Sequence, residues 1–266
     1  KTTQSLIVDY LYPHKGSQKP ANVNRIALVV APAAPVGAST CSRRTVPPEI
    51  DTVTADTLLV RNGAECRIEY RFATIRNADK SPALRAIEQA NIGYFFDSEY
   101  DAASLQEAIE ASIHEIDTTY MPDRPGIVAN HSYEISVESE ISLRDTLLTC
   151  TITRSSYTGG AHGNYGTEYH TYSIPGGCEI TTADLFTERQ LQRLDELIVQ
   201  KLCEKYDAGD RGELGARGFF PDVIGLTENF LLTPDSITFH YNPYDIACYA
   251  TGAIEVTIGW NEFETH

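Results

Sequence analysis

The sequence lacks a hydrophobic run long enough to cross a membrane. Its longest apolar stretch, residues 26–38, is interrupted by Pro32 and Pro35 and is shorter than the roughly 20 residues that a spanning helix needs. The chain begins with Lys1 rather than Met. We therefore expect no transmembrane segment in these residues. We also expect a leading segment to have been removed, with any lipid anchor lying upstream.

Positive charge is scarce. The chain has 21 Lys and Arg against 37 Asp and Glu, which gives a formal net charge of -16. Such a chain repels the phosphate backbone of DNA and RNA and the surface of an anionic bilayer. The composition therefore excludes general nucleic-acid binding and binding to anionic membranes.

The cysteines form no metal-binding or redox motif. The sequence has 6 of them, with no C-x-x-C pair and no spacing typical of metal ligands. Zinc ribbons and thioredoxin-type sites are thereby excluded, and we predict no metal and no cofactor. Cys66 and Cys150 fall in step with the apolar residues of alternating stretches, which favours buried free thiols over a disulfide.

Signatures of nucleophilic catalysis and of nucleotide binding are also missing. The chain contains no G-x-S-x-G, S-x-x-K, H-E-x-x-H or G-x-x-x-x-G-K pattern. No standard hydrolase or nucleotide-dependent enzyme is therefore predicted. Acid and base groups far apart in the sequence remain open as an alternative.

The chain has enough apolar residues to bury a core of ordinary size, with 42% hydrophobic residues and 15 Tyr. Its apolar residues also recur with clear periodicity. Apolar and polar residues alternate, as in half-buried strands, over residues 66–72, 133–137, 148–152, 172–174, 237–241 and 254–258. Three stretches have the pattern of helices. The first is residues 82–96, after Ser81-Pro82, and the other two are stretches with apolar residues at helical spacing, one after the capping box at Ser104 and one after the capping box at Thr187. This order predicts an α+β fold, with mainly antiparallel sheets packed by about three helices.

The texture of the sequence sets its first part apart from the rest. Residues 1–54 are rich in proline and small residues and predict an irregular arm with a strand at residues 5–12. The length of the chain suits one large domain or two small ones.

Two segments are candidates for a site. The first is glycine-rich and carries Tyr157, Gly160, His162 and Tyr165. Its glycines permit tight turns and a close approach of a ligand to the main chain. The imidazole of His162 can act as a base, as a metal ligand, or as a hydrogen-bonding group that pins the turn to the sheet. His170, in step with Tyr172, reads instead as a packed histidine.

The second segment surrounds an Asn-Pro turn and carries four candidate binding residues: Tyr241, Asn242, Tyr244 and Tyr249. A tyrosine ring has apolar faces and a polar hydroxyl, so it suits either the solvent-exposed edge of a core or a sugar-binding face. A catalytic alternative pairs His162 with a carboxylate such as Asp184 or Asp245, and it requires these groups to converge in one pocket.

These segments resemble a known family. The residues from Gly159 to Gly163, the run Asp184-Leu185-Phe186 and the residues from Asn242 to Ala247 are similar, in order and spacing, to the C-terminal domain of RsiV-like envelope proteins. Upstream, Tyr94-Phe95-Phe96 and the helix after Ser104 resemble the N-terminal domain found in PdaC-like peptidoglycan deacetylases. The resemblance implies two domains after the arm, a PdaC-type N-terminal domain over residues 55–155 and an RsiV-like C-terminal domain over residues 156–266. Cys248 departs from the pattern, where proline is usual. The combination is similar to Bacteroidetes envelope lipoproteins of uncharacterised function.

The resemblance implies an exported α+β protein of the periplasm or the outer membrane surface, with no catalytic residue in either domain. It favours a non-catalytic module that binds peptidoglycan glycan or a basic lysozyme-like protein, whose positive charge the acidic surface would attract. A hydrolase of cell-wall polymers that uses His162 and a structural lipoprotein without a small ligand are the alternatives.

Overall fold

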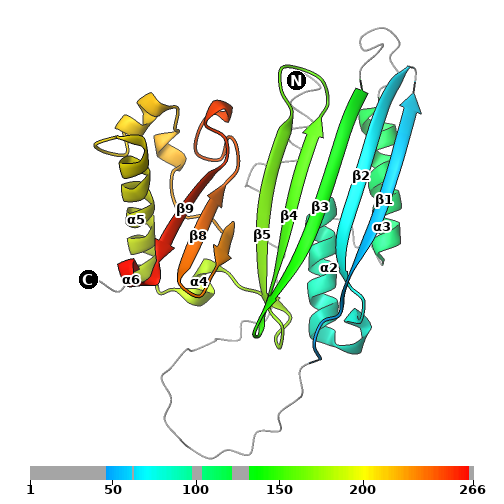
Figure 1. Ribbon diagram of the computed structural model, residues 1–266, viewed down its shortest axis with the longest axis horizontal. Helices are drawn as coiled ribbons and strands as arrows, with labels where there is room; N and C mark the ends of the chain where they lie inside the picture. The colour runs from blue at the N-terminus through cyan, green and yellow to red at the C-terminus, as the bar shows by residue number, and fades with distance from the viewer. Residues whose placement is uncertain (1–45, 62, 98–103, 122–131, 264–266) are drawn as a thin grey trace, which may run out of the picture.

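The computed structural model in Figure 1 describes residues 46–61, 63–97, 104–121 and 132–263. These residues form two β-sheets, each packed against helices. The strand expected at residues 5–12 lies outside the described part of the chain.

The first sheet is mixed and has six strands in sequence order. They are β1 (Ile50–Arg61), β2 (Ala64–Ile75), β3 (Ser132–Arg144), β4 (Leu147–Tyr157), β5 (Asn164–Ser173) and β6 (Cys178–Glu179). Only β2 and β3 pair in parallel; the other neighbours are antiparallel. From Ala64 to Phe72, β2 buries every second side chain, so over these residues one face of the sheet is apolar and the other is polar.

The parallel pair requires a crossover, and two helices supply it. They are α2 (Pro82–Phe96) and α3 (Leu105–Glu115), preceded by η1 (Ala78–Lys80) and followed by the π-helical η2 (Ile116–Tyr120). Both lie on the same face of the sheet in Figure 1. Leu84, Ile87 and Phe95 of α2 are almost completely buried against Phe72 and its neighbours. The first core lies between these helices and the sheet.

The second sheet is antiparallel and has its own core. Its strands are β7 (Phe230–Leu232), β8 (Ser236–Tyr241) and β9 (Ile254–Gly259), and its main helix is α5 (Glu188–Tyr206). The short helices are α4 (Thr182–Leu185), η3 (Glu213–Arg217), η4 (Pro221–Val223), η5 (Tyr249–Thr251) and α6 (Trp260–Phe263). A capping box of Thr187 and Gln190 starts α5, whose buried stripe includes Leu194 and Ile198. That stripe packs in one cluster with Phe239 of β8.

Two asparagines join the second sheet to the edge of β5. Asn242 accepts a hydrogen bond from the Thr167 backbone N–H at 2.7 Å and donates to the Thr167 carbonyl at 3.1 Å. Asn229 accepts from the Tyr169 N–H at 2.9 Å and donates to the Thr167 carbonyl at 2.8 Å. The two side-chain amides thus occupy backbone groups that an additional strand would otherwise pair.

The expected fold class is confirmed, including three long helices at the positions that the caps indicated. The expected boundary between the two domains falls at residues 155 and 156. Residues 155 and 156 lie inside β4, and the first sheet runs from β1 to β6 before the second unit begins. Residues 50–54, assigned to the irregular arm, belong to β1. Within the described residues, no helix is long and apolar enough to span a bilayer.

Candidate functional site

The two candidate segments meet around the ring of Tyr249. The imidazole of His162 stacks on this ring, with the centroids 3.7 Å apart and the planes inclined by 17°. Tyr165 meets it edge to face at 6.0 Å, and Tyr244 lies against it at 5.6 Å. We call these four residues the aromatic cluster. Because β5 and its preceding loop supply two of the rings and the segment after β8 supplies the other two, the cluster exists only where the two sheets join.

Glycines allow the loop between β4 and β5 to approach the rest of the cluster. Gly160 has a φ of 102°, a conformation that side chains rarely adopt. At Gly163, a Cβ atom would lie 2.8 Å from the Ser156 carbonyl oxygen, so only glycine fits there. The hydroxyl of Tyr249 donates to the Gly163 carbonyl at 2.6 Å. The hydroxyl of Tyr157 donates to the Gly160 carbonyl at 3.3 Å.

Tyr244 is held in an unusual backbone conformation. Its φ is 73°, a value that favours glycine, and its side chain is 52% exposed. The turn around it is fixed on both sides, because the Asp245 N–H donates to the Asn242 carbonyl and the Asp245 carboxylate accepts from the Asn242 N–H. A large exposed ring kept in a strained conformation is a frequent feature of binding sites.

A groove of about 370 Å³ begins at the aromatic cluster and extends over the polar face of the first sheet. We call it the sheet groove. Its lining combines aromatic rings, hydroxyls and charges: Arg67, Glu69, Glu134, Ile135, Ser136, Ser155, Ser156, Tyr157, Gly163, Asn164, Tyr165 and Tyr249. This volume lies in the range of small-molecule sites. Five of these residues belong to no motif that marks them as site residues in the sequence: Arg67, Glu69, Glu134, Ser136 and Ser155.

The groups of the catalytic alternative are engaged separately. The His162 Nδ1 atom lies 2.9 Å from the Gly163 carbonyl oxygen, and no described carboxylate forms an ion pair with it. Asp184 closes the capping box of α4 by accepting from the N–H and the hydroxyl of Thr181. Asp245 accepts from the Asn242 N–H in its own turn.

Two of the predicted binding residues serve the fold instead of the aromatic cluster. Tyr241 is buried, and its hydroxyl donates to the Gly225 carbonyl at 2.7 Å. Burial raises the pKa of this phenol. Asn242 is 8% exposed, and its side-chain amide bonds to the backbone of Thr167 in β5, as described above.

A second concentration of polar groups lies at the carboxyl end of α2. The ring of His170 stacks on Tyr94 at 3.7 Å, and its two nitrogens face Glu179 at 2.8 Å and Glu168 at 3.5 Å. Burial by itself lowers the pKa of His170, but the hydrogen bonds and charges of the two glutamates outweigh it and raise the pKa. Arg154 donates to the carbonyl groups of the last turn of α2.

This second cluster stabilises a helix end rather than forming a pocket of useful size. The guanidinium of Arg154 lies against the unpaired carbonyls that end every α-helix, where positive charge is favourable. The adjoining cavity is about 20 Å³, enough for one water molecule. His170 is packed, as its position beside Tyr172 indicated.

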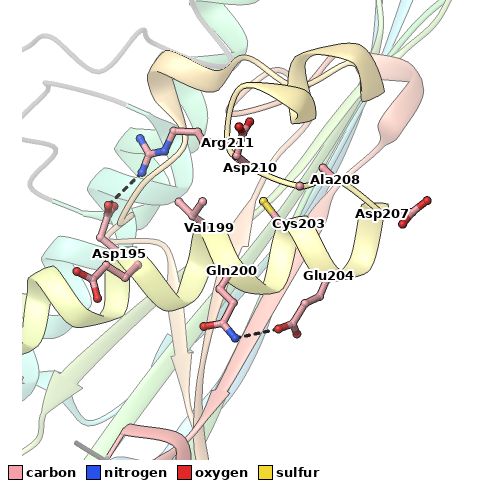
Figure 2. A pocket seen from close by; sticks show the side chains of 11 residues that line it. Asp195, Val199, Gln200, Cys203, Glu204, Asp207, Ala208, Asp210 and Arg211 are labelled. Carbon is pink, nitrogen blue, oxygen red and sulfur yellow. Dashed lines mark hydrogen bonds and ion pairs between the residues drawn. The ribbon is translucent and has the colours of Figure 1, made fainter.

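A concavity of about 690 Å³ runs along α5 and is acidic (Figure 2). Its apolar floor is Val199, Cys203 and Ala208, and its carboxylates are Asp195, Glu196, Glu204, Asp207 and Asp210. Arg211 is its cation and pairs with Asp195 at 3.2 Å. Figure 2 shows the carboxylates spread along the groove, not gathered at one point. Consistently, the described residues contain no group of three or more side chains that could hold a metal ion.

The thiols of the first core are poor candidates for chemistry. Cys66 and Cys150 are buried and free, as expected. Burial raises the pKa of Cys66 to about 11 and that of Cys150 to about 12, so both stay protonated at neutral pH. The arrangement therefore supports binding at the aromatic cluster and sheet groove better than it supports nucleophilic catalysis.

Residues 183–261 match the profile of a family described as "Protein of unknown function (DUF3298)". The matched residues include α5, the second sheet, and Tyr244 and Tyr249 of the aromatic cluster. The assignment to RsiV-like and PdaC-type domains is not confirmed by this match. No curated protein matches the chain.

Two solved structures have the same overall architecture. A member of the DUF3298 family from Bacteroides fragilis is 26% identical, with a TM-score of 0.67, and the match covers 83% of this chain and 94% of that one. A DUF3298 family protein from Pseudomonas aeruginosa is 17% identical, with a TM-score of 0.57, over 82% of this chain and 93% of that one. The second likeness concerns the fold alone.

Proposed function

We propose that this protein is a non-catalytic binding module of the bacterial cell envelope, whose aromatic cluster binds the glycan of peptidoglycan. In this proposal the protein is exported to the periplasm or the outer membrane surface as a lipoprotein. The resemblance to RsiV-like and PdaC-type domains supports the location, and so does the bacterial source of the two similar structures.

The observation that carries the proposal is the convergence of half-exposed rings beside a polar groove. Tyr157, Tyr165 and Tyr244 are 39%, 40% and 52% exposed. Leaving such rings in water is unfavourable unless something covers them. A sugar ring is apolar on its faces and carries hydroxyls at its edge, so it can stack on a tyrosine while its hydroxyls bond to the polar groups beside it.

Cosedimentation with insoluble peptidoglycan tests the proposal. Tyr249→Ala removes the ring that the other three contact, and we expect binding to weaken at least about tenfold, as at a central residue of an interface. Tyr249→Phe is the matched control, because it keeps the ring and loses only the bond to Gly163. Glycan binding should persist as salt rises. Equal retention of the alanine variant and the unaltered protein would refute the proposal.

A second candidate ligand is a basic lysozyme-like protein. The net charge of -16 and the acidic groove along α5 favour it, because opposite charges speed encounter and align partners. A complex of this kind should weaken steeply as salt rises. Absence of both binding and inhibition of lysozyme at low salt would exclude it.

A further inference from the structure

We propose, on the basis of the glycan-binding function above, that the ligand continues from the aromatic cluster along the sheet groove, and that the groove selects an uncharged, hydroxyl-bearing glycan over an anionic one. The residues that carry this inference are Glu69, Glu134, Ser136 and Ser155. They belong to three neighbouring strands of the first sheet.

Strand register places these side chains in rows across the polar face. Glu69 lies beside Ser136, Ser136 beside Ser155, and Ser155 beside Tyr165, so one row runs from β2 to β5. A second row places Glu134 between Arg67 and Tyr157. Side chains two residues apart on a strand point to the same face, so both rows face the same side.

The length of the row exceeds one sugar ring. Tyr165 and Glu69 are separated by three inter-strand spacings, or about 14 Å at 4.7–4.9 Å each. Ser136 and Ser155 are small, and they stand between a glutamate and a tyrosine. The floor is therefore lowest in the middle of the row, where an extended chain can lie on the sheet with its first ring against Tyr165.

The charges that line the sheet groove determine which kind of glycan it can bind. Glu69 and Glu134 are exposed acceptors that can take hydrogen bonds from hydroxyls, and bonds to an ionised acceptor are the stronger kind. Arg67 is the single cation among the residues that line the groove. It lies 3.9 Å from Glu69, and both side chains are more than half exposed, so the pair is weak. An anionic polymer would meet this excess of carboxylate as well as the net charge of -16.

Two oligosaccharides of matched length distinguish the outcomes by calorimetry: neutral chitin fragments and hyaluronan fragments, which carry a carboxylate on alternate sugars. We expect chitin fragments to bind at least tenfold more tightly at low salt, with little dependence on salt. The double variant Glu69→Gln with Glu134→Gln should narrow that ratio, because it removes the repulsion and the charged acceptors together.

Ser155→Ile fills the middle of the groove with a branched side chain that suits a strand, and it should weaken chitin binding at least tenfold. Thr153→Ile is the control, because Thr153 is exposed on the same face of β4 but does not line the groove. Hyaluronan binding equal to chitin binding would overturn this inference, as would unchanged affinity of Ser155→Ile. Binding to peptidoglycan but not to chitin would overturn the inference alone. Binding to neither polymer would overturn the proposed function as well.

Discussion

Replacing Asn242 with alanine tests how the two sheets are joined. The side chain of Asn242 bonds both the N–H and the carbonyl of Thr167 in a site that is 8% exposed. The carbonyl keeps a second donor, because Asn229 also bonds it at 2.8 Å. The cost of Asn242→Ala therefore falls on the Thr167 N–H, which loses its partner, and on the buried His240 Nε2, which lies 3.2 Å from the Asn242 Oδ1 atom.

The size of the effect follows from those contacts. A hydrogen bond contributes about 0.5–1.5 kcal/mol net, and a buried group left without a partner costs about 1–3 kcal/mol. We expect Asn242→Ala to lower the free energy of unfolding by about 2–3 kcal/mol. For a chain of this size, that loss corresponds to a fall in Tm of about 5–10 °C. The double variant with Asn229→Ala should lose more than the sum of the single losses, because the Thr167 carbonyl then loses both donors.

Urea unfolding followed by circular dichroism measures these losses. Asn164→Ala is the control, because Asn164 lies on the same strand and its side chain forms no hydrogen bond within the described residues. The control should stay within about 0.5 kcal/mol of the unaltered protein. An equally small change for Asn242→Ala, or strict additivity with Asn229→Ala, would refute this account of the junction.

Three further predictions concern titration, thiols and strain. The folded-state pKa of His170 lies above its ordinary value of 6.5, so its protonated form stabilises the fold below that value, and this contribution is lost as pH rises through the raised pKa. The free energy of unfolding should therefore fall as the pH rises from 6.5 through the raised pKa, and His170→Gln should make this fall smaller. A free energy of unfolding that stays constant over this pH range in the unaltered protein would contradict the prediction. A thiol reagent followed by peptide mapping should label exposed Cys178 in the native state but Cys66 and Cys150 only after unfolding, and native labelling of either core thiol would disprove their burial. Tyr244→Gly relieves about 1–2 kcal/mol of left-handed strain but adds about 0.5–1 kcal/mol of chain entropy. Stability should therefore change by less than about 1 kcal/mol while peptidoglycan retention falls, and a stability loss above about 2 kcal/mol would show that the strain is not there.

The long elements could be predicted from the sequence because their signals are local. Ser81-Pro82, the Ser104 box and the Thr187 box each mark a helix start within one turn of its observed position. β1 was missed because it is an edge strand. None of its residues is buried, so its alternation of apolar and polar residues is weak.

The expected boundary at residue 155 rests on the resemblance to two domains, and the composition of the chain around it is ambiguous. Glycines between β4 and β5 serve a hairpin loop, but a linker between domains has the same composition. Pairing partners, which distinguish the two, are not local information. The observed continuity of β4 therefore could not be predicted from the glycines.

The candidate site was predictable in part. Both segments were identified by composition, but the stacking of His162 on Tyr249 joins residues that lie far apart in the chain. The sheet groove depends on the parallel register of β2 and β3, which no local pattern determines. Tyr241 could have been set aside, because it continues the inward alternation of Ile237 and Phe239.

The pairing of β2 with β3 also has a kinetic consequence. Each strand forms an antiparallel partnership with a close neighbour in the chain, β1 for β2 and β4 for β3. The contact between Ile68 and Ile135 must instead wait until the whole segment carrying α2 and α3 is enclosed in a loop. We expect two hairpins to form early and the middle of the sheet to close last, so that the centre of the finished fold is the slowest part of it to assemble.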